Sequence, residues 1–137
     1  MPFNPHMVQV DTTRNPTDGQ KHDGFWEVLA YSHADPDSAI RFSASPARPV
    51  LVKEVVHVVE TPFGASATLD VGDGSDADYW LAQGDIGENS AGDLRSSLLA
   101  TVARPGRWYT ANGEVKVTVG GTHSAGAGRL LVYLIRL

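Results

Sequence analysis

Short apolar runs separated by turn residues cover most of the chain, and such alternation is typical of β-strands. Residues 50–60 form the strongest run: they are rich in valine, and Thr61-Pro62 ends them. Strict alternation divides this run into two faces, with Val52, Val56 and Val58 on one and Val55, His57 and Val59 on the other. Lys53-Glu54 interrupts the pattern and indicates an edge, a bulge or a change of sheet.

Two further runs are apolar on both faces. Residues 129–137 form the first, and residues 25–32 form the second. In the second run, one predicted face carries Phe25, Leu29 and Tyr31, and the other carries Trp26, Val28 and Ala30. A strand that is apolar on both faces belongs in the centre of a sandwich or at a contact between subunits.

Turn signals divide the rest of the chain. Asn112-Gly113 stands between residues 107–111 and 114–119 and predicts a β-hairpin, because both central residues of a tight turn need positive φ. In the second of these runs, Val115, Val117 and Val119 are predicted to face the core. Residues 66–71 and 98–103 are also predicted strands. The loop at residues 72–76 ends the first of them and leads into a single helical turn that Asp76 can cap.

About eight short strands and no long helix predict an all-β fold, an antiparallel, jelly-roll-like β-sandwich. The sandwich is expected to span residues 25–137 as one domain. Residues 1–24 contain three prolines and little apolar surface, so we expect an extended N-terminal arm. The arm is either disordered or ordered along the surface of a partner.

Composition excludes several functions. The net charge of −5 argues against a general affinity for nucleic acid, and the apolar runs are too short to span a membrane. The chain has no cysteine, so it has neither disulfides nor thiolate zinc sites, which fits synthesis in a reducing cytoplasm. Its first residues do not resemble a signal peptide.

No cofactor or catalytic set is predicted. The central loop gathers four weak candidates for calcium ligands, Asp70, Asp73, Asp76 and Asp78. Their spacing is not that of an EF-hand, and aspartates that cap turn amides are the preferred interpretation. The histidines are scattered; a metal site built from His57 and His123 is a weaker alternative. No serine lies in a Gly-x-Ser-x-Gly sequence, so the chain is not expected to be an enzyme.

Several strings in residues 50–137 resemble small structural proteins of tailed bacteriophages. They are Thr68-Leu-Asp-Val-Gly-Asp-Gly-Ser-Asp-Ala-Asp78, Gly84-Asp-Ile86, Ser90-Ala-Gly-Asp93, Val115-Lys-Val-Thr-Val-Gly-Gly-Thr122 and Ala125-Gly-Ala-Gly-Arg129. In that family, jelly-roll-like domains decorate or cement capsids without catalysis. The resemblance implies a virion protein, made in the host cytoplasm, that binds the outside of the major capsid protein shell as a homotrimer.

Apolar residues of the arm and exposed aromatic rings are the expected contacts with the capsid or with sister subunits. They are Phe3, Met7, Val8, Val10, Phe25, Trp26, Trp80 and Trp108. The alternative is a glycan-binding module of a tail fibre, with Trp80, Trp108 and Tyr109 as a stacking platform and calcium in the aspartate loop. Another tail or connector component would share the fold.

Overall fold

The computed structural model describes residues 24–35 and 38–136, and its regular elements in these ranges are all β-strands. None of the described residues forms a helix long and apolar enough to cross a membrane. The expected arm lies outside the described residues, except for Gly24, which begins the first strand. In order, the strands are β1 (Gly24–Ser32), β2 (Ser38–Phe42), β3 (Val50–Thr61), β4 (Ala67–Gly72), β5 (Leu94–Ser96), β6 (Arg107–Tyr109), β7 (Gly113–Gly121) and β8 (Ala127–Arg136).

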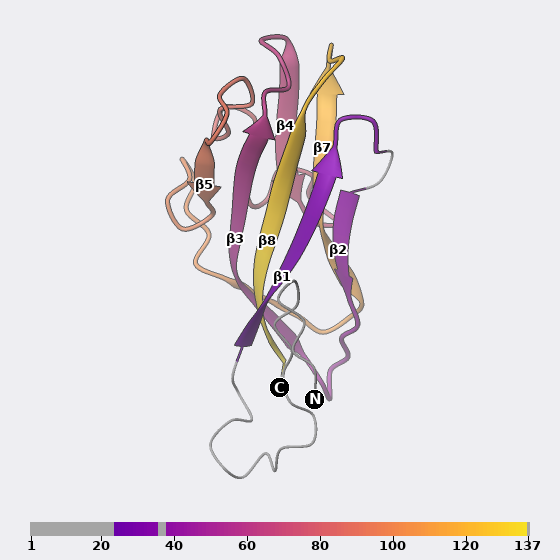
Figure 1. Cartoon of the computed structure of the whole chain (residues 1–137). Coiled ribbons are helices and arrows are strands. Elements are labelled where there is room, and N and C mark those ends of the chain that lie inside the picture. The colour runs from indigo at the N-terminus through magenta and orange to yellow at the C-terminus, as the bar shows by residue number, and fades with distance from the viewer. Residues whose placement is uncertain (1–23, 36–37, 137) are drawn as a thin grey trace, which may run out of the picture.

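The strands form two antiparallel sheets that face each other (Figure 1). The larger sheet has the order β1-β8-β3-β5, and β6 pairs with β3 on the same edge as β5. The smaller sheet has the order β2-β7-β4. The pairs β1–β8, β2–β7 and β3–β6 nest within one another along the chain, as in a jelly roll. The all-β, jelly-roll-like prediction is therefore confirmed.

The long strand β3 contains an irregularity in its pairing with β8. The register shifts between Val52 and Glu54, so Lys53-Glu54 marks a β-bulge. Because the bulge adds one residue, Val52 faces inward together with Val55 and Val59. The strict alternation predicted for this run is therefore wrong across the bulge.

The core lies between the sheets; the predicted inward face of β7 is confirmed, and the two predicted faces of β1 separate, with Phe25, Leu29 and Tyr31 inward. Tyr31 of β1 and Val115 and Val117 of β7 are buried, and Phe25, Leu29 and Val119 pack against them. Loop residues close the ends of the core: Phe63, Trp80, Leu81 and Ile86. Leu81 also forms a single β-bridge with Val71, so the irregular segment after β4 continues the edge of the smaller sheet.

Three local predictions are wrong. The two runs beside Asn112-Gly113 do not form a hairpin, because β6 pairs with β3 in the larger sheet while β7 joins the smaller one. Residues 98–103 form turns and bends instead of a strand. The expected helical turn after the aspartate loop is a hydrogen-bonded turn, closed by the amide of Tyr79 on the carbonyl of Asp76 at 3.3 Å.

Candidate interaction surface

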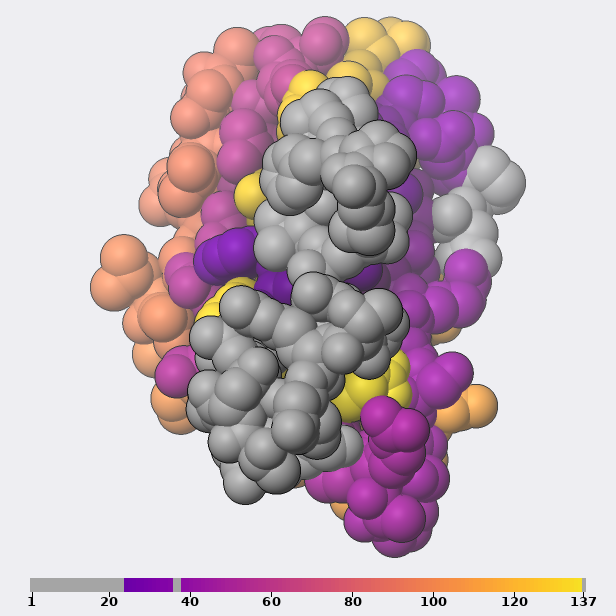
Figure 2. Space-filling model, turned by 60° about the horizontal axis from the view of Figure 1, so that its bottom comes forward, coloured from indigo at the N-terminus to yellow at the C-terminus, as the bar shows by residue number. Residues whose placement is uncertain are grey.

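Exposed apolar side chains gather on β5, β6 and the segment that connects them. We call this set the β5–β6 edge; it consists of Leu94, Leu98, Leu99, Val102 and Trp108. Leu99 is 87% exposed and Trp108 is 51% exposed. The segment runs along one flank of the sandwich beside β3 (Figure 1), and the same flank is visible in Figure 2. Leu94 and Trp108 mark the two ends of the β5–β6 edge, opposite Val58 and Leu51 of β3. Exposed apolar surface of this kind is typical of interaction sites on soluble proteins.

The backbone beneath the β5–β6 edge is fixed by buried hydrogen bonds. Ser97 is fully buried; its hydroxyl accepts the amide of Val55 at 2.9 Å, and its own amide donates to the Val55 carbonyl at 2.8 Å. The Arg104 amide donates to the Ser97 carbonyl at 2.8 Å. Leu98 and Leu99 therefore project from an anchored segment, which lowers the entropy lost when a partner binds.

Asp85 anchors the middle of the same segment. Its carboxylate accepts the Thr101 hydroxyl at 2.7 Å and the Thr101 amide at 3.1 Å. Burial alone would raise the pKa of Asp85, but the hydrogen bonds from Thr101 and Ala82 outweigh burial and hold this pKa below its ordinary value. The charged form of Asp85 is therefore the one that ties the β5–β6 connection to the preceding loop.

The outer face of the larger sheet carries a second apolar region. Trp26 and Tyr133 are cross-strand partners whose ring centroids lie 5.2 Å apart. Val28, the next outward residue of β1, is 42% exposed and pairs with Leu131. Both strands were predicted to be apolar on two faces, and β8 lies between β1 and β3 in the sheet. A central position in the sheet does not by itself explain an apolar outer face, so we expect the outer face of β8 to make a contact.

The aromatic residues assigned to an interface fall into two groups. Trp26 and Trp108 lie on outward faces of the larger sheet. Phe25 packs against the core, and Trp80 is only 1% exposed, so the assignment of these two rings to an interface does not fit their burial. Trp80 is buried because the turn after β4 folds back through the Val71–Leu81 bridge. Phe3, Met7, Val8 and Val10 lie outside the described residues.

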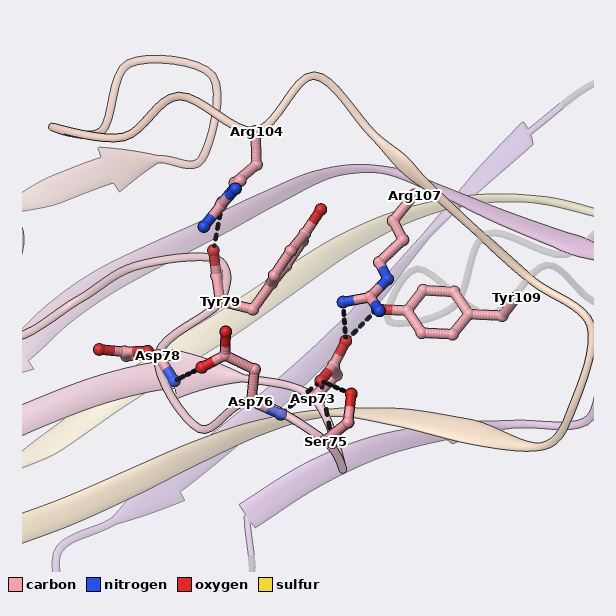
Figure 3. A network of polar contacts seen from close by, with 8 residues as sticks. All are labelled: Asp73, Ser75, Asp76, Asp78, Tyr79, Arg104, Arg107 and Tyr109. Carbon is pink, nitrogen blue, oxygen red and sulfur yellow. Dashed lines mark hydrogen bonds and ion pairs between the residues drawn. The ribbon is translucent and has the colours of Figure 1, made fainter.

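The aspartate loop is held by one nearly buried carboxylate (Figure 3). The Asp73 side chain is 2% exposed, and Oδ2 accepts Tyr109 Oη at 2.6 Å and Arg107 Nη1 at 3.0 Å. Oδ1 accepts the amides of Ser75 and Asp76 and the Ser75 hydroxyl, at 2.9–3.0 Å. Burial alone would raise the pKa of Asp73, but the hydrogen bonds from Tyr109, Ser75 and Asp76 outweigh burial and lower it.

Stacked cations join the same loop to the start of β6 and to the segment before it. The guanidinium carbons of Arg104 and Arg107 lie 4.3 and 4.5 Å from the ring centroid of Tyr79, and Arg104 Nε donates to the Tyr79 carbonyl at 3.0 Å (Figure 3). The Trp80 ring packs edge-on against Tyr79 at 4.9 Å. The loop after β4 and the approach to β6 are thus one cross-linked unit.

The four aspartates do not converge on one point. Asp70 accepts the amide of Gln83 at 2.7 Å, and Asp76 accepts the amide of Asp78 at 3.4 Å. Both oxygens of Asp73 are already occupied by donors from its own chain. Within residues 24–35 and 38–136, no three His, Asp or Glu side chains are arranged to hold a metal ion. These aspartates act as anchors and caps of turns.

The predicted glycan-stacking platform does not form. Trp80 is buried, and Tyr109 directs its hydroxyl to Asp73 while its ring packs edge-on against Phe42 at 5.0 Å. Trp108 alone of the three proposed rings is strongly exposed. Two rings of the platform are therefore committed to internal packing.

Trp108 of the β5–β6 edge is among the predicted contacts, but Leu98, Leu99 and Val102 are not, because the sequence predicts a strand over residues 98–103. Leu98, Leu99 and Val102 would have been half-buried in such a strand, whereas here they project into solvent. The nearby Arg104-Pro105-Gly106 sequence was a usable signal, because a turn that close leaves little room for a paired strand.

Comparisons with known proteins identify the fold. No protein-family model and no curated protein sequence matches the chain. A chain from the acidic stable capsid structure of Helicobacter pylori bacteriophage KHP30 superposes with a TM-score of 0.56 at 13% identity, over 80% of this chain and 86% of that one. A chain from the cyanophage Pam1 capsid asymmetric unit superposes with a TM-score of 0.54 at 17% identity, over 98% of this chain and 99% of that one. At these identities the likeness establishes a shared fold: the chain is a jelly-roll-like β-sandwich of the kind found in two bacteriophage capsid structures.

Proposed function

We propose that this chain is a non-enzymatic bacteriophage capsid decoration protein that binds the outside of the major capsid protein shell and stabilises the head. The observation that carries the proposal is the β5–β6 edge, five exposed apolar side chains on an anchored backbone. The shared fold with chains of two phage capsid structures supports the same function. The protein would be made in the host cytoplasm and reside in the virion.

Two surfaces would divide the contacts. The β5–β6 edge would meet the major capsid protein, because its exposed leucines can enter grooves between shell subunits. The outer face of the larger sheet, around Trp26, Val28 and Tyr133, would meet sister copies in a homotrimer. A trimer presents three edges at once, so weak individual contacts would add up to firm attachment through multivalency.

Cosedimentation with capsids tests the capsid contact. Purified protein is mixed with empty heads of its own phage that lack it, and the bound fraction is measured for wild type, Leu99→Lys and Thr118→Lys. Thr118 is exposed on the smaller sheet opposite Asp70, so its variant adds the same charge at a place where it is tolerated. We expect wild type and Thr118→Lys to bind and Leu99→Lys to bind at least about tenfold more weakly.

Equal binding by Leu99→Lys and wild type would exclude the β5–β6 edge as the capsid contact. Failure of wild type to bind heads would exclude decoration altogether.

Analytical ultracentrifugation tests self-association separately. Wild type should sediment as a trimer, and Val28→Lys should dissociate the trimer, because a charge on this apolar face opposes its burial. A monomeric wild type would refute the trimer while leaving the capsid test intact.

A further inference from the structure

Two histidines that are far apart in the sequence meet at one end of the sandwich. His33 directly follows β1, and His123 lies in the connection between β7 and β8. Their Nδ1 atoms are 3.0 Å apart, although 90 positions separate them, and their rings pack edge-on with centroids 5.2 Å apart. Both residues are partly buried, so the pair borders solvent.

The backbone on both sides of the histidine pair is fixed. The amide of His33 donates to the carbonyl of Gly126 at 2.9 Å, next to Ser32 and Ala127, the last paired residues of β1 and β8. Gly126 has a φ of +132° and lies against the Phe63 ring, which leaves no room for a side chain. The two imidazoles are therefore carried by segments that are tied to each other.

We propose that His33 and His123 form a bidentate site for a divalent transition metal, preferably Cu²⁺ or Ni²⁺. Imidazole nitrogens bind these ions at about 2.0–2.1 Å. Two nitrogens 3.0 Å apart then subtend about 94° at the metal, close to the right angle between neighbouring ligands in square-planar or octahedral sites. Tetrahedral zinc needs nitrogens about 3.3–3.4 Å apart, so this spacing disfavours zinc.

Metal binding changes the protonation of the pair in a defined way. Without metal, a hydrogen bond between the two Nδ1 atoms requires that one of them carries a proton and the other a lone pair. A metal needs the lone pair of both Nδ1 atoms, so the ring that carries Nδ1–H must change tautomer: it loses this proton to water and takes one from water on Nε2. Each ring then turns until both Nδ1 lone pairs point at the ion. Water completes the coordination, since the described residues supply no third His, Asp or Glu ligand.

Isothermal titration of the full-length protein with Cu²⁺, Ni²⁺ or Zn²⁺ in a non-coordinating buffer tests the site. We expect one ion per chain, bound in the order Cu²⁺, then Ni²⁺, then Zn²⁺. His33→Ala and His123→Ala should each weaken Cu²⁺ binding by on the order of tenfold or more, because loss of either ligand removes the chelate. The double variant should bind no more weakly than the single ones.

Two controls separate this site from other histidines. The double variant His6→Ala/His22→Ala should keep the affinity, because those residues precede β1 in sequence and are not members of the pair. Substoichiometric Cu²⁺ should broaden the ring proton resonances of His33 and His123 before those of His57, which is buried in the core. The proposal would be overturned if wild type did not bind Cu²⁺, or if both single variants kept the wild-type affinity. It would also be overturned if His6→Ala/His22→Ala lost that affinity.

Discussion

Asp73→Asn should destabilise the protein, because it removes the hydrogen bonds that one oxygen of a buried carboxylate accepts. The amide can keep its oxygen toward the amides of Ser75 and Asp76, where Oδ1 now caps the turn. Its NH₂ group then faces the Arg107 guanidinium, which has no acceptor, and the Tyr109 hydroxyl, which in wild type donates to Oδ2, so both charge-assisted hydrogen bonds are lost. Such bonds contribute about 1.5–3 kcal/mol each. Because the Arg107 side chain is 38% exposed and can regain water, we expect a loss near the lower limit, about 3 kcal/mol in total.

Urea unfolding followed by tryptophan fluorescence measures this loss, and Tm should fall by about 10 °C. Tyr109→Phe is the matched control: it removes one hydrogen bond to Asp73 and keeps the ring against Phe42, so it should cost only about 1.5 kcal/mol. The double variant should lose less than the sum of the two single losses, because both remove the same bond. A value for Asp73→Asn within about 0.5 kcal/mol of wild type would refute the anchoring role.

The pH dependence of stability gives a second test of Asp73. Its pKa is lower in the folded protein than in the unfolded chain, so the stabilisation is present above the unfolded pKa of 3.8 and is lost as pH falls through the folded pKa. Wild type should therefore lose stability below about pH 4, and Asp73→Asn should lack this part of the decline. Parallel acid unfolding curves for the two proteins would contradict this explanation.

Three further perturbations test other parts of the structure. Burial lowers the pKa of His57 from 6.5 to about 4. As pH falls from 6.5 to 4, the free energy of unfolding should therefore fall by up to about 1.4 kcal/mol per pH unit. His57→Gln should flatten this slope, and an unchanged slope would exclude His57 as its source. Ser97→Ala leaves the buried amide of Val55 without its acceptor, so it should lower the free energy of unfolding by about 1–2 kcal/mol. It should also accelerate hydrogen exchange in the segment between β5 and β6, and unaltered exchange would contradict the anchoring. Gly126→Ala should lower the free energy of unfolding, measured by thermal unfolding, by more than about 2 kcal/mol, because the φ of Gly126 is positive and the Phe63 ring occupies the position of the added Cβ. The control Gly74→Ala adds its Cβ in open space and should stay within about 0.5 kcal/mol of wild type. Equal losses would refute the steric argument.

Sequence patterns predicted the strands whose faces differ in polarity or whose apolar runs are long. The inward set of β7 followed directly from alternation, and so did the two apolar faces of β1. The sequence indicates an edge, a bulge or a change of sheet at Lys53-Glu54, and the pairing with β8 shows that it is a bulge, which changes which residues face inward.

The hairpin prediction failed because it depended on a distant partner. Asn112-Gly113 favours a hairpin locally, but the segment before it pairs with Val50–Val52, more than fifty positions earlier in the chain. Local propensity contains no information on such a partner. The same reason hid the contact of His33 with His123, and the exposure of Leu99, which depends on the anchoring of Ser97 to β3.

Cryo-electron microscopy of the intact phage particle tests the central claim most directly. The account predicts density for this chain on the outer surface of the head, with the β5–β6 edge, Leu99 foremost, against the major capsid protein. Density for the chain at the tail or connector, or on the head with the β5–β6 edge facing solvent, would contradict it.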